Sequence, residues 1–339
     1  MNVLRLAKDL VVGNTMSNDS AYFYGRLSTT GKSVYNSMVS GIKSFSADIM
    51  LPYVSHNEVS EVFNSVLRDN PLIFYTTSYS VTSSAQKRQC RFYPNYIYPQ
   101  HIAKQHIDQV MRYLRYFDAV QGKPDIEKEL YVHDFCLNHF TYDYAFGEHA
   151  FSVLGPVLKS SAVCEGIAKF VKLALDYLGV KNIFVSGNAI DPMNGTNSKH
   201  AWNMVSISEQ TFHLDVTFNL TQKTAHNRYD YFNLCDNEIK KDHSFANIFP
   251  KCVTADRDYY SMYGMTANSP AELGSMIGNN IRQGKMITIA KLRNTTDAAN
   301  ILSKVVAIAE RQYSSVHNRS FMVEVRHNPA QMVFEIEYK

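Results

Sequence analysis

The chain has 339 residues, of which 45% are hydrophobic and 19% are charged, so it can bury a core and is neither disordered nor a low-complexity repeat. Its length corresponds to about two domains at roughly 150 residues each, or to one enzyme core with flanking modules. Lys and Arg number 34 against 31 Asp and Glu, which gives a net charge of +3. That balance lacks the basic surface that neutralises nucleic-acid phosphates, so we expect no nucleic-acid partner.

The N-terminal residues do not read as a leader sequence. Arg5, Lys8 and Asp9 interrupt the apolar residues there, and no stretch of the chain approaches the ~18 apolar residues that span a membrane. We therefore expect a cytoplasmic protein that makes no contact with a membrane, or a secreted one if a leader has been removed.

Five cysteines are scattered through the chain without a C-x-x-C pair: Cys90, Cys136, Cys164, Cys235 and Cys252. Their number is odd and too low for a disulfide framework. Tetrahedral zinc sites usually show closely spaced pairs of Cys or His, which this sequence lacks. We therefore expect no metal site and at least one free thiol.

Residues 1–41 are interpreted as an N-terminal extension, and residues 42–100 as an accessory module with the order β-α-β-β. A first strand is predicted at residues 45–50. Ser55 and Glu58 form a capping box that opens a helix, which ends at the Asn70-Pro71 pair. Two strands rich in aromatic and β-branched residues follow, at residues 72–79 and 89–93.

Residues 101–250 are predicted to form the functional core, which begins with two amphipathic helices. The second starts near Asp125, and His133 lies on its apolar stripe. His133 and Asp134 together could suggest a metal-dependent phosphohydrolase. We favour a hydrogen-bonded histidine that faces the core, because further spaced ligands are missing.

A third helix is predicted over residues 164–178, where six apolar residues recur at helical spacing before Gly179 ends it. Cys164 lies in the first turn, where unpaired backbone N–H groups and the positive end of the helix dipole stabilise a thiolate. The alternative is that Cys164 is one more packed core thiol.

Strands are predicted at residues 182–187, 199–207 and 211–218, and the last two form a hairpin with a short turn at Ser208-Glu209. For a loop of two or four residues, His200 lies opposite Asp215 or one diagonal step away, on the same face. The other face carries the apolar residues of the hairpin. The pattern thus predicts an imidazole and a carboxylate side by side, away from the packed side of the sheet.

Residues 251–339 are interpreted as a C-terminal accessory module. A strand at residues 286–292 precedes a helix whose apolar face runs from Ala298 to Ala309. A hairpin follows, with strands at residues 321–326 and 332–338 and a turn at Asn328-Pro329. The two terminal modules therefore share the order β-α-β-β.

Cys164 at a helix N-terminus, His200 on one strand and Asp215 on the next are the parts of a nucleophilic cysteine site. The imidazole takes or shares the thiol proton, and the carboxylate fixes its tautomer and stabilises the imidazolium. We therefore predict these three residues as the catalytic group.

Four motifs in order also resemble the transglutaminase-like superfamily of cysteine enzymes, and most of all its bacterial transglutaminase-like proteases. They are Ala-Val-Cys-Glu-Gly at 162–166, Val-Ser-Gly at 185–187, His-Ala-Trp-Asn at 200–203 and His-Leu-Asp-Val-Thr at 213–217. The resemblance implies an α+β fold with a papain-like transglutaminase core, in which the nucleophile helix packs on an antiparallel sheet. It assigns Cys164 as nucleophile, His200 as base and Asp215 as the partner that orients the base.

The implied reaction is acyl transfer without a cofactor, in which Cys164 forms a thioester with a peptide or protein substrate. The first reading is a cysteine peptidase or amidase. Alternatives are a protein-glutamine transglutaminase with an amine acceptor, or a non-catalytic scaffold of the same fold that binds peptides.

Four further residues are expected to contact the substrate. Trp202 falls on the family's aromatic position after the histidine, and Gly166 belongs to the nucleophile motif. His213 shares the hairpin face with His200, although it could be only a cross-strand neighbour of Trp202. Tyr142 is a candidate second donor to the oxyanion, together with Tyr144 and His149.

Overall fold

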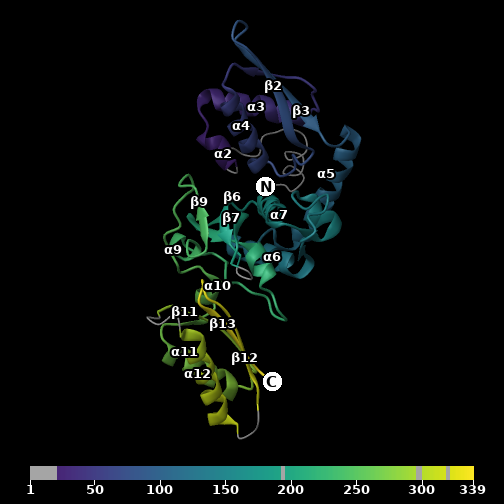
Figure 1. Ribbon diagram of the computed structural model, residues 1–339. Coiled ribbons are helices and arrows are strands. Elements are labelled where there is room, and N and C mark those ends of the chain that lie inside the picture. Colours follow the sequence, from purple (N-terminus) through teal and green to yellow (C-terminus); the bar gives the residue numbers. More distant parts are fainter. Residues whose placement is uncertain (1–20, 192–194, 295–299, 318–320) are drawn as a thin grey trace. The chain divides into compact units, whose positions relative to one another are not determined.

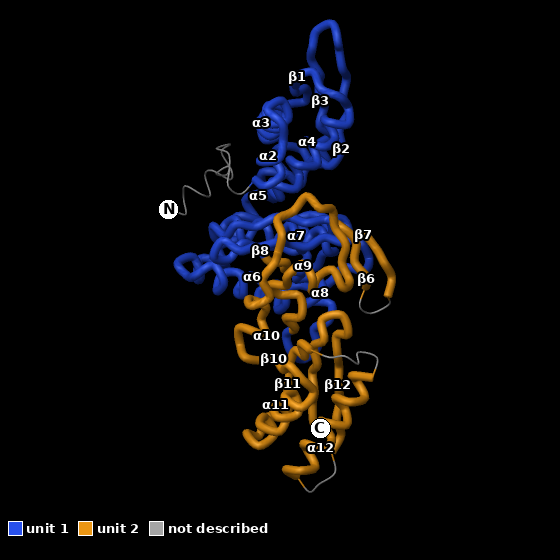
Figure 2. Tube along the Cα trace, turned by 90° about the vertical axis from the view of Figure 1, so that its left-hand side faces the viewer, with its two compact units in different colours: residues 1–186, 200–211, 215–227 blue, residues 187–199, 212–214, 228–339 orange. Residues whose placement is uncertain are grey.

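A computed structural model describes residues 21–191, 195–294, 300–317 and 321–339 (Figure 1). The fold is α+β, and it divides into two compact units. Unit 1 comprises residues 1–186, 200–211 and 215–227, and unit 2 comprises residues 187–199, 212–214 and 228–339 (Figure 2). These units do not follow the four predicted segments, because parts of the predicted core belong to each. Among the described residues, no helix is long and apolar enough to cross a bilayer.

The N-terminal part of unit 1 is a three-stranded antiparallel sheet with helices packed together beside it. The sheet has the strand order β1-β3-β2, and α3 packs against both α4 and β1. The elements are α2 (Tyr22–Arg26), α3 (Thr29–Lys43), β1 (Ile49–Pro52), α4 (His56–Asp69), β2 (Thr76–Ser84) and β3 (Gln89–Tyr96). The order β-α-β-β from β1 to β3 agrees with the prediction, and we call this part, residues 21–98, the N-terminal module.

Several predicted boundaries in this module differ from the structure, and all three strands end later than predicted. Helix α3 crosses the predicted limit at residue 41, because its buried face packs on α4. Strand β1 starts four residues later than predicted, since Phe45 has a left-handed backbone with φ 58° that no strand accommodates. Strand β2 starts at Thr76, and the predicted strand residues 72–75 are buried but belong to no strand.

The rest of unit 1 is mainly helical and surrounds α7 (Cys164–Tyr177), eleven of whose residues are buried. Helix α6 packs against α7, and the short helix α8 contacts both. The elements are α5 (Gln100–Leu114), the 3₁₀ helix Arg115–Val120, α6 (Asp125–His139), β4 (Thr141–Tyr142), the π-helical turn Gly155–Lys159, β5 (Ser161–Ala162) and α8 (Val216–Thr221).

A four-stranded sheet with the order β8-β7-β6-β9 carries the predicted hairpin. Its strands are β6 (Asn182–Ile190), β7 (Asn197–Ile207), β8 (Gln210–Leu214) and β9 (His243–Phe245). Strand β8 is shorter than predicted, because residues 216–218 begin helix α8 rather than continue the strand. Strands β6 and β7 also shorten the predicted connection at residues 188–198, of which residues 192–194 lie outside the described part of the chain.

The C-terminal part of unit 2 has a sheet with the order β10-β11-β13-β12 and a core shared with two helices. Its predicted strand, helix and hairpin are present, with an additional helix, α11, before them. Unit 2 contains α9 (Asp236–Ile239), α10 (Tyr259–Met262), β10 (Thr266–Ala267), α11 (Pro270–Arg282), β11 (Ile287–Leu292), α12 (Ile301–Val316), β12 (Val323–Asn328) and β13 (Val333–Tyr338). Residues 295–299, where the predicted helix began, lie outside the described residues.

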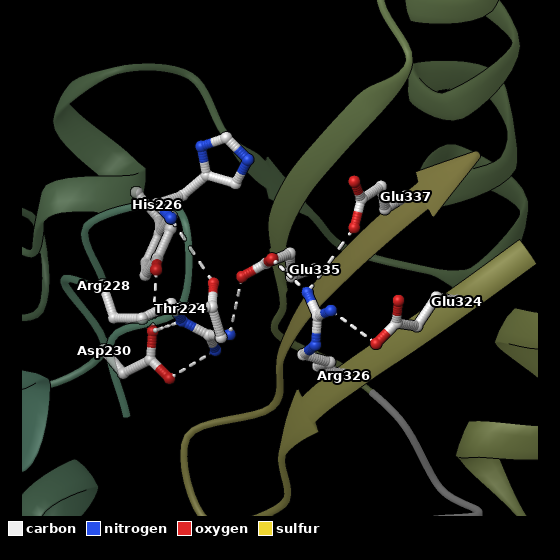
Figure 3. A network of polar contacts seen from close by, with 9 residues as sticks. Thr224, His226, Arg228, Asp230, Glu324, Arg326, Glu335 and Glu337 are labelled. Carbon is white, nitrogen blue, oxygen red and sulfur yellow. Dashed lines mark hydrogen bonds and ion pairs between the residues drawn. The ribbon is translucent and has the colours of Figure 1, made fainter. Parts of the chain in front are cut away.

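An ion-pair network centred on the buried Arg228 connects residues 228–230 to strands β12 and β13 of this sheet (Figure 3). Arg228 Nη2 lies 2.7 Å from Asp230 Oδ2, and Arg228 Nη1 lies 3.2 Å from Glu335 Oε2 on β13. Arg326 of β12 reaches the other oxygen of Glu335 at 2.8 Å. Burial alone lowers the pKa of Arg228, but the neighbouring carboxylates outweigh it and keep the guanidinium charged.

Replacing Arg228 with Met is expected to destabilise unit 2 strongly, because the buried Asp230 would lose its guanidinium partner and Glu335 would keep only Arg326. Breaking a buried pair in this way costs about 3–5 kcal/mol. Urea unfolding of the full chain, followed by circular dichroism, measures the effect. The matched control is Lys339→Met, which removes an exposed partner of Glu324 and should barely move the midpoint. Equal midpoints for the two variants would contradict a structural role for Arg228.

Candidate active site

Cys164 is the first residue of α7, and it is the one partly exposed cysteine among the five. The N-cap residue, Val163, has no side-chain hydrogen bond to the helix, so the backbone N–H groups of the first turn are not capped by it. Donors and dipole at this end of α7 favour negative charge. On its inner side Cys164 packs against a small apolar cluster of Ala168, Phe184 and Ala201.

A close approach of backbone fixes the first turn of α7. A Cβ on Gly166 would lie 2.2 Å from the carbonyl oxygen of Ala150, so only glycine fits there. The N–H of Val163 donates to the same carbonyl at 3.1 Å. Gly166 is buried, and its contacts are with the segment 147–154 rather than with solvent. Gly166 thus packs the nucleophile helix against this segment, and its predicted substrate contact stays a prediction.

His200 on β7 and Asp215 after β8 form a buried pair. His200 Nε2 lies 2.7 Å from Asp215 Oδ2, and their side chains are 7% and 0% exposed. The other oxygen of Asp215, Oδ1, accepts from the N–H of Phe218 at 3.0 Å and so caps α8. Because each carboxylate oxygen has its own partner, the orientation of the Asp215 side chain relative to the His200 ring is fixed.

The surroundings of His200 favour its charged form. Burial lowers the pKa of this imidazole, but the Asp215 carboxylate and a side-chain hydrogen bond to Cys164 outweigh burial and raise the pKa to about 10. His200 therefore contacts both predicted partners. An imidazole has two nitrogens, and since Nε2 faces Asp215, Nδ1 is the nitrogen available to the thiol.

Two aromatic rings enclose this imidazole. The ring of Trp202 lies nearly parallel to it, with centroids 5.9 Å apart and an interplanar angle of 20°. The ring of Phe218 lies at 4.6 Å and 43°. Both aromatic side chains are almost fully buried. They limit the access of water to His200, which strengthens its interaction with Asp215.

The burial of the hairpin corrects another prediction. His200, Trp202, Met204, His213 and Asp215 share the predicted face, but that face is covered as completely as the apolar one. The alternation of polar and apolar residues therefore predicted correctly which side chains share a face, but it did not predict which face is exposed to solvent. Strands buried on both faces show no exposed polar side, and β7 is such a strand from His200 onward.

Two of the predicted substrate contacts are buried as well. His213 is 0% exposed, and its Nε2 lies 2.9 Å from Asp236 Oδ1 within unit 2. Trp202 is 1% exposed. Burial gives each of them a packing role in this structure, and substrate contact by either side chain stays a prediction. Trp202 packs against the imidazole, and His213 fixes the start of α9.

The three candidates for the second oxyanion donor have different surroundings. Tyr142 on β4 is partly exposed, and β4 pairs with β5 directly before Cys164. Tyr144 is 74% exposed. His149 Nδ1 lies 3.3 Å from the hydroxyl of Tyr98. Of the three, Tyr142 is accessible and also pairs through β4 with Ala162, which lies two residues before Cys164.

His133 has the role that we favoured for it. It is fully buried on α6, with Nδ1 3.1 Å from Asp134 Oδ1 and Nε2 3.0 Å from Asn219 Nδ2 of α8. Burial lowers its pKa, so the neutral imidazole joins α6 to α8. Phe218 and Asn219 of α8 are site-supporting residues that sequence reasoning missed, because Phe218 fell at the end of a predicted strand and Asn219 directly after it.

Metal-ligand residue types also meet in unit 2. The ligand atoms of His213, Asp236 and Cys252 lie within 4.8 Å of one another. The Asp236 carboxylate explains why these residues lie together, because His213 and Cys252 both form hydrogen bonds to it. The Lys240 ammonium also lies 3.3 Å from this carboxylate. A cation already neutralises the carboxylate, and we therefore assign no metal to it.

No family model and no curated protein matches the sequence. Among solved structures the chain is similar to a TGase, with 15% identity and a TM-score of 0.33 over 58% of this chain and 60% of that one. It is also similar to a candidate cysteine protease from Cytophaga hutchinsonii, with 12% identity and a TM-score of 0.28 over 41% of this chain and 62% of that one. The chain thus spans less than two thirds of either protein.

Proposed function

We propose that this chain is a cysteine-dependent acyl-transfer enzyme, a peptidase or amidase that cleaves peptide-type amides through a thioester on Cys164. The observation that carries the proposal is that His200 bonds to both Cys164 and Asp215. An acid-base group between a thiol and a buried carboxylate is the arrangement that activates a cysteine nucleophile. Three residues from separate elements, α7, β7 and the N-cap of α8, converge in this way.

In the proposed reaction His200 holds the thiol proton, and the Cys164 sulfur attacks the carbonyl carbon of the amide. The carbonyl oxygen takes the negative charge beside the N–H groups of the first turn of α7. When the C–N bond breaks, the leaving amine takes the proton from His200, and the acyl group remains on sulfur as a thioester. Water then gives a proton to His200 and a hydroxyl to the acyl carbon, which releases the acid and restores the thiol. Asp215 keeps the imidazole oriented throughout.

An amine in place of water would make the same site a transglutaminase. Incubating a glutamine peptide with the chain, with and without a primary amine, separates the two by product mass. We expect the peptidase or amidase to give the hydrolysed product with or without the amine. A product that carries the amine would identify the transferase instead.

Iodoacetamide is expected to alkylate Cys164 of the native chain far faster than the other four cysteines near pH 7. Those four thiols are buried, and burial raises the pKa of Cys136, Cys235 and Cys252. Peptide mapping by mass spectrometry after timed exposure measures each rate. The control is His200→Gln, in which labelling of Cys164 should slow. Uniform slow labelling of all five would favour a non-catalytic scaffold and overturn the proposal.

A further inference from the structure

A pocket of about 140 Å³ lies beside the first turn of α7 in unit 1. Its volume is close to the ~150 Å³ of a cavity that holds one benzene ring, so it accommodates one side chain rather than a whole ligand. Glu165 forms part of the wall, and its Cα is only one peptide unit, about 3.8 Å, from that of Cys164. We call it the module pocket, because the N-terminal module supplies one of its sides.

The walls of the module pocket come from two parts of unit 1. Ile73, Phe74, Ile97 and Tyr98 belong to the N-terminal module, and Phe151 belongs to the segment that packs on α7. Ile97 and Phe151 are each 50% exposed. Large apolar side chains that remain accessible around a hollow are the usual features of a ligand site.

The charges inside the pocket are compensated. Glu165 Oε1 lies 2.6 Å from Lys169 Nζ, which also donates to the carbonyl of Phe151 at 3.1 Å. Glu148 is a second carboxylate in the wall, and its side chain is 78% exposed. Lys169 is therefore already paired, so an acidic side chain of a ligand would find no free cation in the pocket wall. Glu148 would also repel such a side chain at the rim.

We infer that the module pocket binds an aromatic or branched aliphatic side chain of the substrate, next to the amide that Cys164 attacks. The inference rests on the proposed function and adds a substrate class to it. It also gives the N-terminal module a role, because without Ile97 and Phe74 the pocket would have only one apolar side. An uncharged side chain of benzene size matches its volume and its walls, and an acidic one does not.

The test compares three peptides that differ only in one residue flanking the cleaved amide, which is Phe, Gly or Glu. Burying a large apolar side chain in such a pocket is expected to favour the Phe peptide over the Gly peptide by about 10–100-fold in kcat/KM. The Glu peptide should be the poorest of the three. Equal rates for the three peptides would overturn the inference.

Variants of pocket residues locate the preference. Ile97→Ser and Phe151→Ser should each reduce the Phe-to-Gly ratio, and both side chains are half exposed, so folding should tolerate the change. Thr77 lines the pocket and is exposed, so Thr77→Trp should fill it and slow the Phe peptide while sparing the Gly peptide. The matched control is Met50→Ser, which removes an exposed apolar side chain of the same module outside the pocket. A ratio that stays unchanged in all three pocket variants would also overturn the inference.

The outcomes separate this inference from the proposed function. If Cys164 alkylates rapidly and the Gly and Phe peptides are cleaved equally, the catalytic proposal stands and the module pocket fails. If no peptide is cleaved and Cys164 alkylates as slowly as the other cysteines, the catalytic proposal itself is wrong. Measuring both rates on one preparation makes the two failures distinguishable.

Discussion

Cys164→Ser is expected to lower amide cleavage by about 10³-fold or more, since a hydroxyl in the same position does not form the anion that the His200 pair stabilises. Steady-state cleavage of the Phe peptide measures the loss. Helix α7 should remain folded, because Cys164 is only partly buried and serine is well tolerated in the first turn of a helix.

The matched control for this variant is Cys235→Ser. Cys235 is the N-cap of α9, and serine is a preferred residue at that position. This variant should therefore keep both its fold and its activity, although it too has lost one thiol. Comparable losses of cleavage activity in the two variants would show that the effect of Cys164→Ser does not come from removing a nucleophile.

Asp215→Asn is expected to reduce kcat by about 10²–10⁴-fold with little change in the fold. Asparagine can still cap α8 through its carbonyl, because Asn is as good an N-cap as Asp. The carboxylate charge, however, is what outweighs burial at His200, so without it the pKa of the imidazole should fall and His200 should hold a proton less firmly.

Asp215→Ala separates the two functions of this side chain. It removes the cap as well as the charge, so it should cost a further ~1 kcal/mol of stability that Asp215→Asn does not. Thermal unfolding and kcat are measured on both variants. If Asp215→Asn retained full activity, the assignment of Asp215 as orienting partner would be wrong.

The pH dependence of stability gives an independent readout of the same pair. The pKa of His200 is raised in the folded state from 6.5 to about 10, so the native state holds its proton more tightly than the unfolded state. The stabilisation is therefore fully present below pH 6.5 and is lost as the pH rises through about 10. Unfolding midpoints should fall more steeply between about pH 7 and pH 10 in the native chain than in Asp215→Asn.

Helical spacing and strand alternation were sufficient to predict the central parts of the site. Six apolar residues at helical spacing defined α7 and placed Cys164 at its start. Alternation along residues 199–215 put His200 and Asp215 on one side, and they are 2.7 Å apart. These signals are local, because each depends only on residues within one element or one hairpin.

Helix α8 was missed because its first residues have the composition of a strand. Val216, Thr217 and Phe218 are β-branched or aromatic, and that favoured extending β8. Asp215 was the available signal, since an Asp before a short apolar run is also a helix cap. In α11 a similar cap, Ser269 followed by Pro270 and Glu272, was present and was not used.

The surroundings of the site could not be predicted from local patterns. The module pocket brings Ile97 and Phe151 to the same hollow as Glu165, although long stretches of chain separate them. Likewise, burial of Trp202 and His213 depends on what covers the second face of the sheet, and alternation contains no information about that. Such contacts depend on tertiary packing.

The contact between Gly166 and the Ala150 carbonyl has a consequence for where the sequence can vary around Cys164. With no side chain between them, the Ala150 carbonyl and the nucleophile turn lie against each other, and any larger residue at position 166 would push them apart. Ile97 and Thr77 line the proposed module pocket away from this contact, so substitutions there should change the pocket without displacing the Cys164 sulfur.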